Sequence, residues 1–108
     1  MAKIKGRKSK YLKKLNETPY WSEVKRFVRL RDNFACQICG KKTNLDTHHI
    51  SYIDENGKSI VGREKDFLNQ LIILCRDHHT EVHKDLQHSL NPKNPNKIFA
   101  GEFIRKKY

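Results

Sequence analysis

Apolar residues recur every three or four positions in the segment that follows Thr18 and Pro19. This period is typical of a helix with one face in a core. A threonine hydroxyl can cap the first backbone amides of a helix, and proline fits the first helical position because its φ is already helical. The sequence therefore predicts a helix from Pro19 to about Arg31. The apolar stripe that we expect in the core is Trp21, Val24, Phe27 and Val28.

Two shorter apolar segments predict strands. The first covers about residues 45–51, and the second is Leu71-Ile72-Ile73-Leu74. Between them lies a polar segment of roughly twenty residues with Gly57 and Gly62, which is longer than a tight hairpin needs. We interpret this segment as a functional insertion.

A second helix is predicted from Asp77, whose carboxylate suits the N-cap position, to about His88. Asn91-Pro92 and Asn94-Pro95 follow it and prevent its continuation, because proline breaks a helix. The chain then becomes basic. The apolar residues of this last part are expected to dock on the body of the domain: Ile98, Phe99, Phe103 and Ile104.

The composition limits how such a chain can be stabilised. With 108 residues, of which 36% are apolar, it has room for one small domain with a thin core, so a cross-link is expected. Three cysteines, with only two residues between Cys36 and Cys39, do not form a conventional disulfide framework. A metal is the favoured cross-link. Reduced thiolates fit a cytoplasmic protein, and no apolar signal segment or membrane span is visible.

Charge indicates the partner. The 23 Lys and Arg against 12 Asp and Glu give a formal net charge of +11, which favours nucleic acid. We expect a basic arm over 1–17, a folded domain over 18–90 and a basic extension over 91–108. The arm could also be a solvated tail; a membrane partner is disfavoured because the arm lacks an apolar face. Candidate phosphate-binding residues are Lys3, Lys5, Arg7, Lys8, Lys10, Lys13, Lys14 and Arg76.

Two pairs of metal-binding residues share one spacing. Cys36 and Cys39 form the first pair, and Cys75 and His78 form the second. Two such pairs can close the tetrahedral coordination of a structural zinc ion. The alternative is a redox Cys-x-x-Cys motif, with Cys75 merely buried.

Four further histidines suggest a second site. His79 and His83 lie four positions apart, so they share one face of the second predicted helix. His48 and His49 are neighbours on a predicted strand and point to opposite faces, so one can bind the same ion as the helical pair while the other does acid–base work. The alternative is that all four are ordinary surface or core histidines.

Taken together, these motifs resemble the HNH endonuclease family. The resemblance covers about residues 20–85 and is specific because the parts occur in the expected order. It rests on the Trp21-x-x-Val24 stretch leading to Arg31-Asp32-Asn33, on Cys36-Gln37-Ile38-Cys39-Gly40, on His48-His49-Ile50-Ser51-Tyr52, and on Leu74-Cys75-Arg76-Asp77-His78-His79 with His83.

The resemblance implies an α+β fold, a small ββα-metal finger with an N-terminal helix and a structural zinc knuckle. It also implies that His48, His79 and His83 bind a catalytic cation and that His49 is the general base. Family members commonly have cysteine where His78 stands, a change that zinc tolerates. The middle position of the motif falls at Gln70, with Asn69 and Asp66 as alternatives.

The function expected from this resemblance is metal-dependent hydrolysis of DNA phosphodiester bonds, by nicking or double-strand cleavage, with RNA as another possible substrate. The cofactors would be a structural Zn²⁺ and one catalytic Mg²⁺, Mn²⁺, Ni²⁺, Co²⁺ or Zn²⁺. A homodimer or a larger nucleic-acid-processing complex in a bacterial or phage-infected cell would fit. The alternative is a non-catalytic zinc-knuckle module that binds nucleic acid, or a subunit of a phage packaging or restriction complex.

Overall fold

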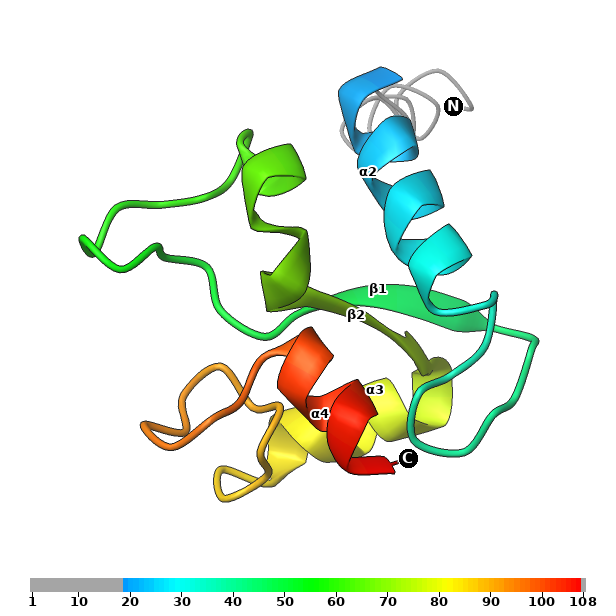
Figure 1. The fold of residues 1–108 in the computed structure, drawn as a ribbon. Coiled ribbons are helices and arrows are strands. Elements are labelled where there is room, and N and C mark those ends of the chain that lie inside the picture. The colour runs from blue at the N-terminus through cyan, green and yellow to red at the C-terminus, as the bar shows by residue number, and fades with distance from the viewer. Residues whose placement is uncertain (1–18, 108) are drawn as a thin grey trace, which may run out of the picture.

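The computed structural model describes residues 19–107, so the predicted basic arm lies outside the described residues (Figure 1). The order of elements confirms a small α+β fold with a two-stranded antiparallel sheet. The elements are α2 (Pro19–Arg31), β1 (Leu45–His49), the 3-10 helix η1 (Glu64–Gln70), β2 (Leu71–Cys75), α3 (Arg76–Lys84) and α4 (Ala100–Lys107).

The strand β2 is buried on both faces, because helices cover the sheet from two sides (Figure 1). Leu71 and Ile73 pack with Val24 and Val28 of α2. The side chains of Ile72 and Leu74 belong to a second cluster. This cluster also contains residues of α3, of α4 and of the segment before α4. Its buried aliphatic members include Ile50, Ile72, Leu74, Val82 and Leu90.

The helix α2 has the predicted bounds, but its apolar stripe is narrower than expected. Val24 and Val28 are fully buried, and Trp21 packs against them at the edge of the cluster. Phe27 is 37% exposed, so its assignment to the core was wrong. The sheet is only two strands wide, and it offers α2 too little surface to cover a fourth position.

The other predicted bounds need three corrections. The first strand ends at His49, two residues early, where the chain turns into the long loop. The helix α3 begins at Arg76 with Cys75 as its N-cap, so Asp77 is not the cap. It ends at Lys84, before His88, because the side-chain amide of Asn91 donates to the carbonyls of Val82 and Asp85 and so replaces the next helical turn.

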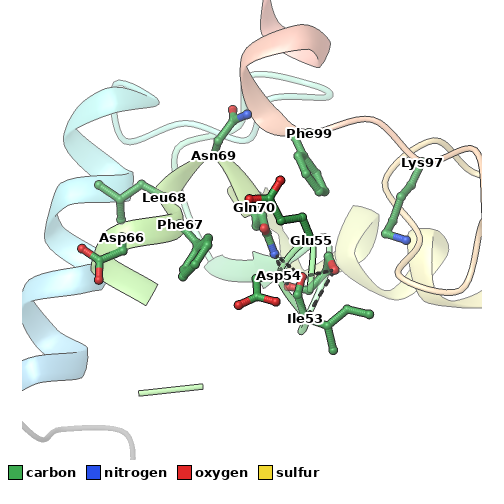
Figure 2. Close-up of a pocket in the computed structure, with 11 residues that line it drawn as sticks. Ile53, Asp54, Glu55, Asp66, Phe67, Leu68, Asn69, Gln70, Lys97 and Phe99 are labelled. Carbon is green, nitrogen blue, oxygen red and sulfur yellow. Dashed lines mark hydrogen bonds between the residues drawn. The ribbon is translucent and has the colours of Figure 1, made fainter. Parts of the chain in front are cut away.

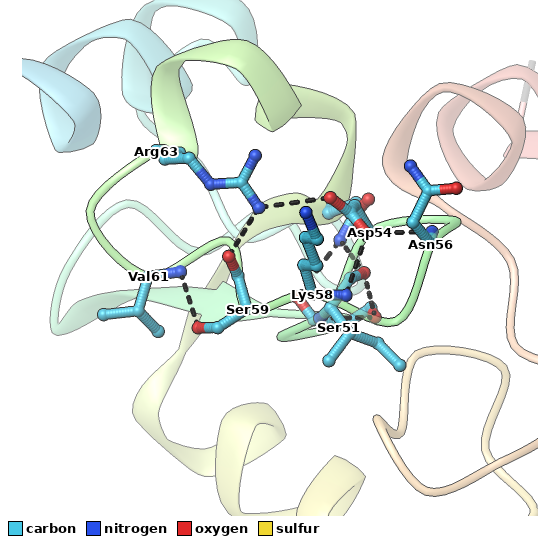
Figure 3. A network of polar contacts seen from close by, with 9 residues as sticks. Ser51, Asp54, Asn56, Lys58, Ser59, Val61 and Arg63 are labelled. Atoms are coloured by element: carbon cyan, nitrogen blue, oxygen red, sulfur yellow. Dashed lines mark hydrogen bonds and ion pairs between the residues drawn. The ribbon is translucent and has the colours of Figure 1, made fainter.

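The predicted insertion between the strands is folded. Asp54 organises it: its carboxylate accepts hydrogen bonds from the backbone amides of Asn56 (2.8 Å) and Lys58 (3.0 Å) and pairs with Arg63 at 3.1 Å (Figure 3). These bonds shape a turn at Gly57, whose φ of +79° favours glycine. The chain then enters η1, an element that the sequence pattern did not predict.

The basic C-terminal segment docks on the body, as predicted, and forms the helix α4. Phe99, Phe103 and Ile104 pack against the cluster around Ile72 and Leu74. Every helix within residues 19–107 is too short or too polar to cross a membrane.

The outer edge of β2 is covered by polar groups from the segment after α2. Asp32 is buried, and its carboxylate accepts a hydrogen bond from the Ile73 amide at 2.9 Å. The backbone amide of Gln37 donates to the Ile73 carbonyl at 3.0 Å. Arg31, the last residue of α2, pairs with the Asp32 carboxylate at 2.7 Å. These contacts satisfy edge groups that a third strand would otherwise pair.

We expect Asp32→Ala to lower the free energy of unfolding by about 2–3 kcal/mol, because it leaves the buried Ile73 amide without an acceptor. Asp32→Asn is the matched control, since its amide oxygen can still accept that bond. Urea unfolding followed by circular dichroism measures both. If both variants lost the same free energy of unfolding, the hydrogen bond from the Ile73 amide to residue 32 would not be the cause.

Candidate functional site

Three cysteines and a histidine converge at one end of the sheet. The ligand atoms of Cys36, Cys39, Cys75 and His78 all lie within 4.8 Å of one another. The Cys39 and Cys75 sulfurs are 3.8 Å apart, and tetrahedral Zn–S bonds of about 2.3 Å would separate two sulfurs by about 3.8 Å. The group could therefore hold a metal ion, and its donor set suits zinc.

The local backbone places the two ligand pairs of this site, Cys36 with Cys39 and Cys75 with His78. In the first half, the Gly40 amide donates to the Cys36 carbonyl at 2.8 Å, and Gly40 has a φ of +82° that closes the turn. In the second half, Cys75 ends β2 and His78 lies in the first turn of α3. The predicted convergence of the two pairs is thus present.

The surroundings of Cys36 favour its thiolate, which is the form that binds metals. Burial alone would raise the pKa of its thiol, but hydrogen bonds from the backbone of Cys75, Cys39 and Ile38 outweigh that effect and lower the pKa to about 7. Burial raises the pKa of Cys75. A bound cation would lower the pKa of both thiols, because metals bind the thiolate.

A second group joins β1 to α3. Ligand atoms of His48, His79 and His83 lie within 4.8 Å of one another, and this group could also hold a metal ion. The Nε2 atoms of His79 and His83 are 3.2 Å apart. Two nitrogens bound to one tetrahedral ion at about 2.0–2.1 Å would be about 3.3 Å apart. The predicted sharing of one helical face is confirmed.

His48 is held with one ring nitrogen free. It is fully buried, and its Nε2 donates to the Leu90 carbonyl at 2.7 Å, while its Nδ1 has no hydrogen-bond partner within the described residues. A buried unpaired nitrogen is costly unless something binds it. Burial lowers the pKa of His48 to about 4, so the ring is neutral at neutral pH and keeps a lone pair for a cation.

His79 is oriented by a carboxylate that the sequence analysis did not identify. Its Nδ1 donates to Asp46 at 3.0 Å, which leaves Nε2 facing His83. Burial opposes ionisation of Asp46, but hydrogen bonds from His79 and Arg76 outweigh it and lower the pKa of that carboxyl. Carboxylate partners of this kind commonly fix metal-binding histidines. The alternation of β1, which places Asp46 and His48 on one face, is the signal that could have found it.

His49 lies on the other face of β1, as predicted, and is enclosed on three sides. Its ring stacks on Tyr52, with centroids 4.6 Å apart, and on Trp21 at 5.6 Å. Its Nε2 donates to the buried Glu64 carboxylate at 3.1 Å, and 13% of the His49 side chain stays exposed. Glu64 was missed because it lies fifteen positions away, in a loop of unpredicted structure.

The residues expected to support His49 do other work. The Gln70 side chain points to the loop and donates to the Ile53 carbonyl at 3.0 Å (Figure 2). Asn69 accepts a hydrogen bond from the Gly101 amide at 2.7 Å and so anchors α4. Asp66 is exposed and lines the pocket of Figure 2. The structure brings none of these three to His49, and Glu64 takes the position instead.

Of the predicted phosphate-binding residues, only Arg76 lies within the described residues. Lys3, Lys5, Arg7, Lys8, Lys10, Lys13 and Lys14 lie outside the described residues. Arg76 is exposed at the start of α3 and pairs with Asp46 at 3.3 Å.

Comparisons of the chain with protein-family models, with curated proteins and with solved structures find no match. By its own structure the chain is an α+β protein with a Cys₃His group suited to zinc.

We expect Cys39→Ser to remove one equivalent of bound zinc and to lower the thermal midpoint sharply, since the metal would link the end of α2 to the start of α3. His83→Ala should leave that zinc in place and change stability little, because it alters only the other group. Zinc content by elemental analysis and melting by circular dichroism test both. Unchanged zinc content in Cys39→Ser would argue against the site.

Proposed function

We propose that this chain is an HNH-type endonuclease that hydrolyses nucleic-acid phosphodiester bonds, with DNA as its substrate and β1, β2 and α3 as a ββα-metal finger. The observation that carries this proposal is the division of labour between two neighbouring histidines. His48 joins His79 and His83, whereas His49 is held apart by Glu64 on the opposite face of the same strand.

The histidine group suits a divalent cation. Its three neutral nitrogens fit zinc, nickel, cobalt or manganese better than magnesium, which prefers oxygen donors. When bound, the cation would supply Lewis-acid stabilisation of charge developing on the phosphodiester oxygens. The chain's own contribution is to orient the rings: Leu90 holds His48 and Asp46 holds His79.

His49 is the proposed general base. Because a carboxylate accepts hydrogen bonds, Glu64 keeps the ring hydrogen on Nε2 and leaves the lone pair on Nδ1. A water molecule gives its proton to Nδ1 while its oxygen forms the new bond to phosphorus. The bond from phosphorus to the 3′ oxygen breaks, and that oxygen takes a proton from solvent and leaves as a hydroxyl. Glu64 stabilises the resulting imidazolium, and the rings of Trp21 and Tyr52 restrict its rotation.

One cavity has a wall residue from each of the two histidine environments. Tyr52, which stacks on His49, and His83 both line it. A phosphate held beside His83 would therefore lie at a cavity whose wall includes Tyr52, the residue stacked on His49. The two carboxylates nearest the histidines, Asp46 and Glu64, are already paired, which reduces repulsion of the phosphate.

We expect the purified chain to nick supercoiled plasmid when Mn²⁺, Ni²⁺, Co²⁺ or Zn²⁺ is added. His49→Ala and His83→Ala should each reduce nicking at least about 100-fold, because general-base catalysis alone contributes about 10²–10⁴. His88→Asn is the control: His88 lies outside both metal groups, and asparagine keeps an acceptor for the Leu90 amide. Tight DNA binding without nicking under every metal would favour the non-catalytic module instead.

Glu64→Ala should lower kcat about 10–100-fold with little change in KM or in metal content, since the carboxylate positions His49 and contacts no candidate metal ligand. Glu64→Gln should retain part of the activity, because its amide oxygen can still accept from Nε2. Glu55→Gln, at an exposed glutamate of the same segment between the two strands, controls for the loss of charge. A Glu64→Ala enzyme with unchanged kcat would exclude this positioning role.

A further inference from the structure

A cavity of about 420 Å³ opens beside the candidate metal group. This volume falls in the range of roughly 300–1,000 Å³ that is usual for small-ligand sites. His83 forms part of its wall, so a phosphate held at the histidine group would lie at the cavity mouth.

The walls of this cavity combine apolar surface and positive charge. Tyr52, Ile53 and Leu86 line it and are unusually exposed for large apolar residues, at 46%, 52% and 55%. Lys93 and Lys97 complete the lining on the side of the C-terminal segment. Apolar and aromatic surface beside cations suits a nucleotide, whose base stacks while its phosphate pairs with lysine.

A neighbouring cavity has the opposite character, although it shares Ser51, Ile53 and Lys97 with the first. Its lining contains three acidic residues, Asp54, Glu55 and Asp66 (Figure 2). No acidic residue within the described part of the chain lines the cavity beside His83. A polyanion is therefore favoured in one cavity and repelled from the other.

The cavity wall is held in place by buried asparagines. Asn91 donates to the carbonyls of Val82 and Asp85, and its side-chain oxygen accepts from the Lys93 amide at 2.7 Å. Asn94 donates to the carbonyls of Gln87 and His88 at 3.0 and 2.9 Å. The wall is thus formed before any ligand binds, which lowers the entropic cost of binding.

We propose that this cavity binds an unpaired nucleotide of the substrate strand, next to the phosphodiester bond that is cut. This inference rests on the proposed nuclease function and names the form of substrate that its site accepts. The base lies against Tyr52 and Leu86, and Lys93 and Lys97 contact the adjoining phosphate. An unpaired nucleotide fits because a base inside a duplex cannot leave its stack without an energetic cost.

The test compares two double variants in the His49→Ala background, which preserves the substrate during measurement. Leu86→Ser with Lys93→Ser alters the cavity. Leu30→Ser with Lys42→Ser is the matched control, because Leu30 and Leu86 are both 55% exposed and neither control residue lines the cavity. Fluorescence anisotropy with Mn²⁺ measures binding of a short single-stranded oligodeoxynucleotide and of its duplex.

The cavity variant should bind the single strand about tenfold more weakly than the control, with less effect on the duplex. Its salt dependence should fall by about 0.7 in slope for the lost lysine contact. Equal single-strand affinities in the two double variants would overturn the inference. Plasmid nicking by the chain with His49 intact is measured separately. If nicking is absent while the single-strand effect persists, the nuclease proposal fails and the cavity stands as a nucleotide site.

Discussion

The two-residue period of β1 determines what each of its histidines can do. Because successive side chains point to opposite faces, His48 and His49 enter different environments although they are joined by one peptide bond. The antiparallel register opposes His48 to Ile72 and His49 to Leu71. A slip of one residue would exchange their environments and would also separate Cys75 from its partners. The pairing of two short strands is therefore the constraint on which both candidate centres depend.

A sheet of two strands is weak by itself, and this protein supports it from several directions. Asp32 satisfies the outer edge of β2, and the Cys₃His group offers a cross-link where β2 meets α3. Helices on both faces remove β2 from water completely. Carboxylates are scarce in this basic chain, and several of them have structural tasks: Asp32 at the edge, Asp54 in the loop, Asp46 and Glu64 beside the histidines.

Local sequence spacing predicted the parts of the candidate site that local geometry controls. The pairs Cys36 and Cys39, and His79 and His83, converge because three or four positions along a turn or helix bring side chains together. The opposite orientation of His48 and His49 follows from strand geometry in the same way. The bounds of α2 agree with the predicted helix from Pro19 to about Arg31, which rested on the proline at its start and on the apolar period.

The contacts that the sequence did not predict join residues far apart in the chain. Glu64 reaches His49 only because the Asp54 turn and η1 fold the insertion back on β1, and no periodic pattern describes such a path. The spacing of the family motif therefore indicated Gln70 or Asn69 as the partner of His49. The Gln70 side chain instead bonds to the loop, and the Asn69 side chain bonds to α4. The helix α3 ends early for a related reason, since Asn91 meets its last carbonyls from nine residues away.

The irregular segment after α3 holds the His48 ring in place, because the Leu90 carbonyl accepts its hydrogen bond. That segment supplies the acceptor that sets the tautomer of a buried imidazole, while its next residues form a cavity wall. Excising only β1, β2 and α3 would therefore keep the three clustered histidines but leave the His48 ring free to rotate. The smallest unit that keeps this histidine group in order is therefore larger than the segment that contains its three histidines.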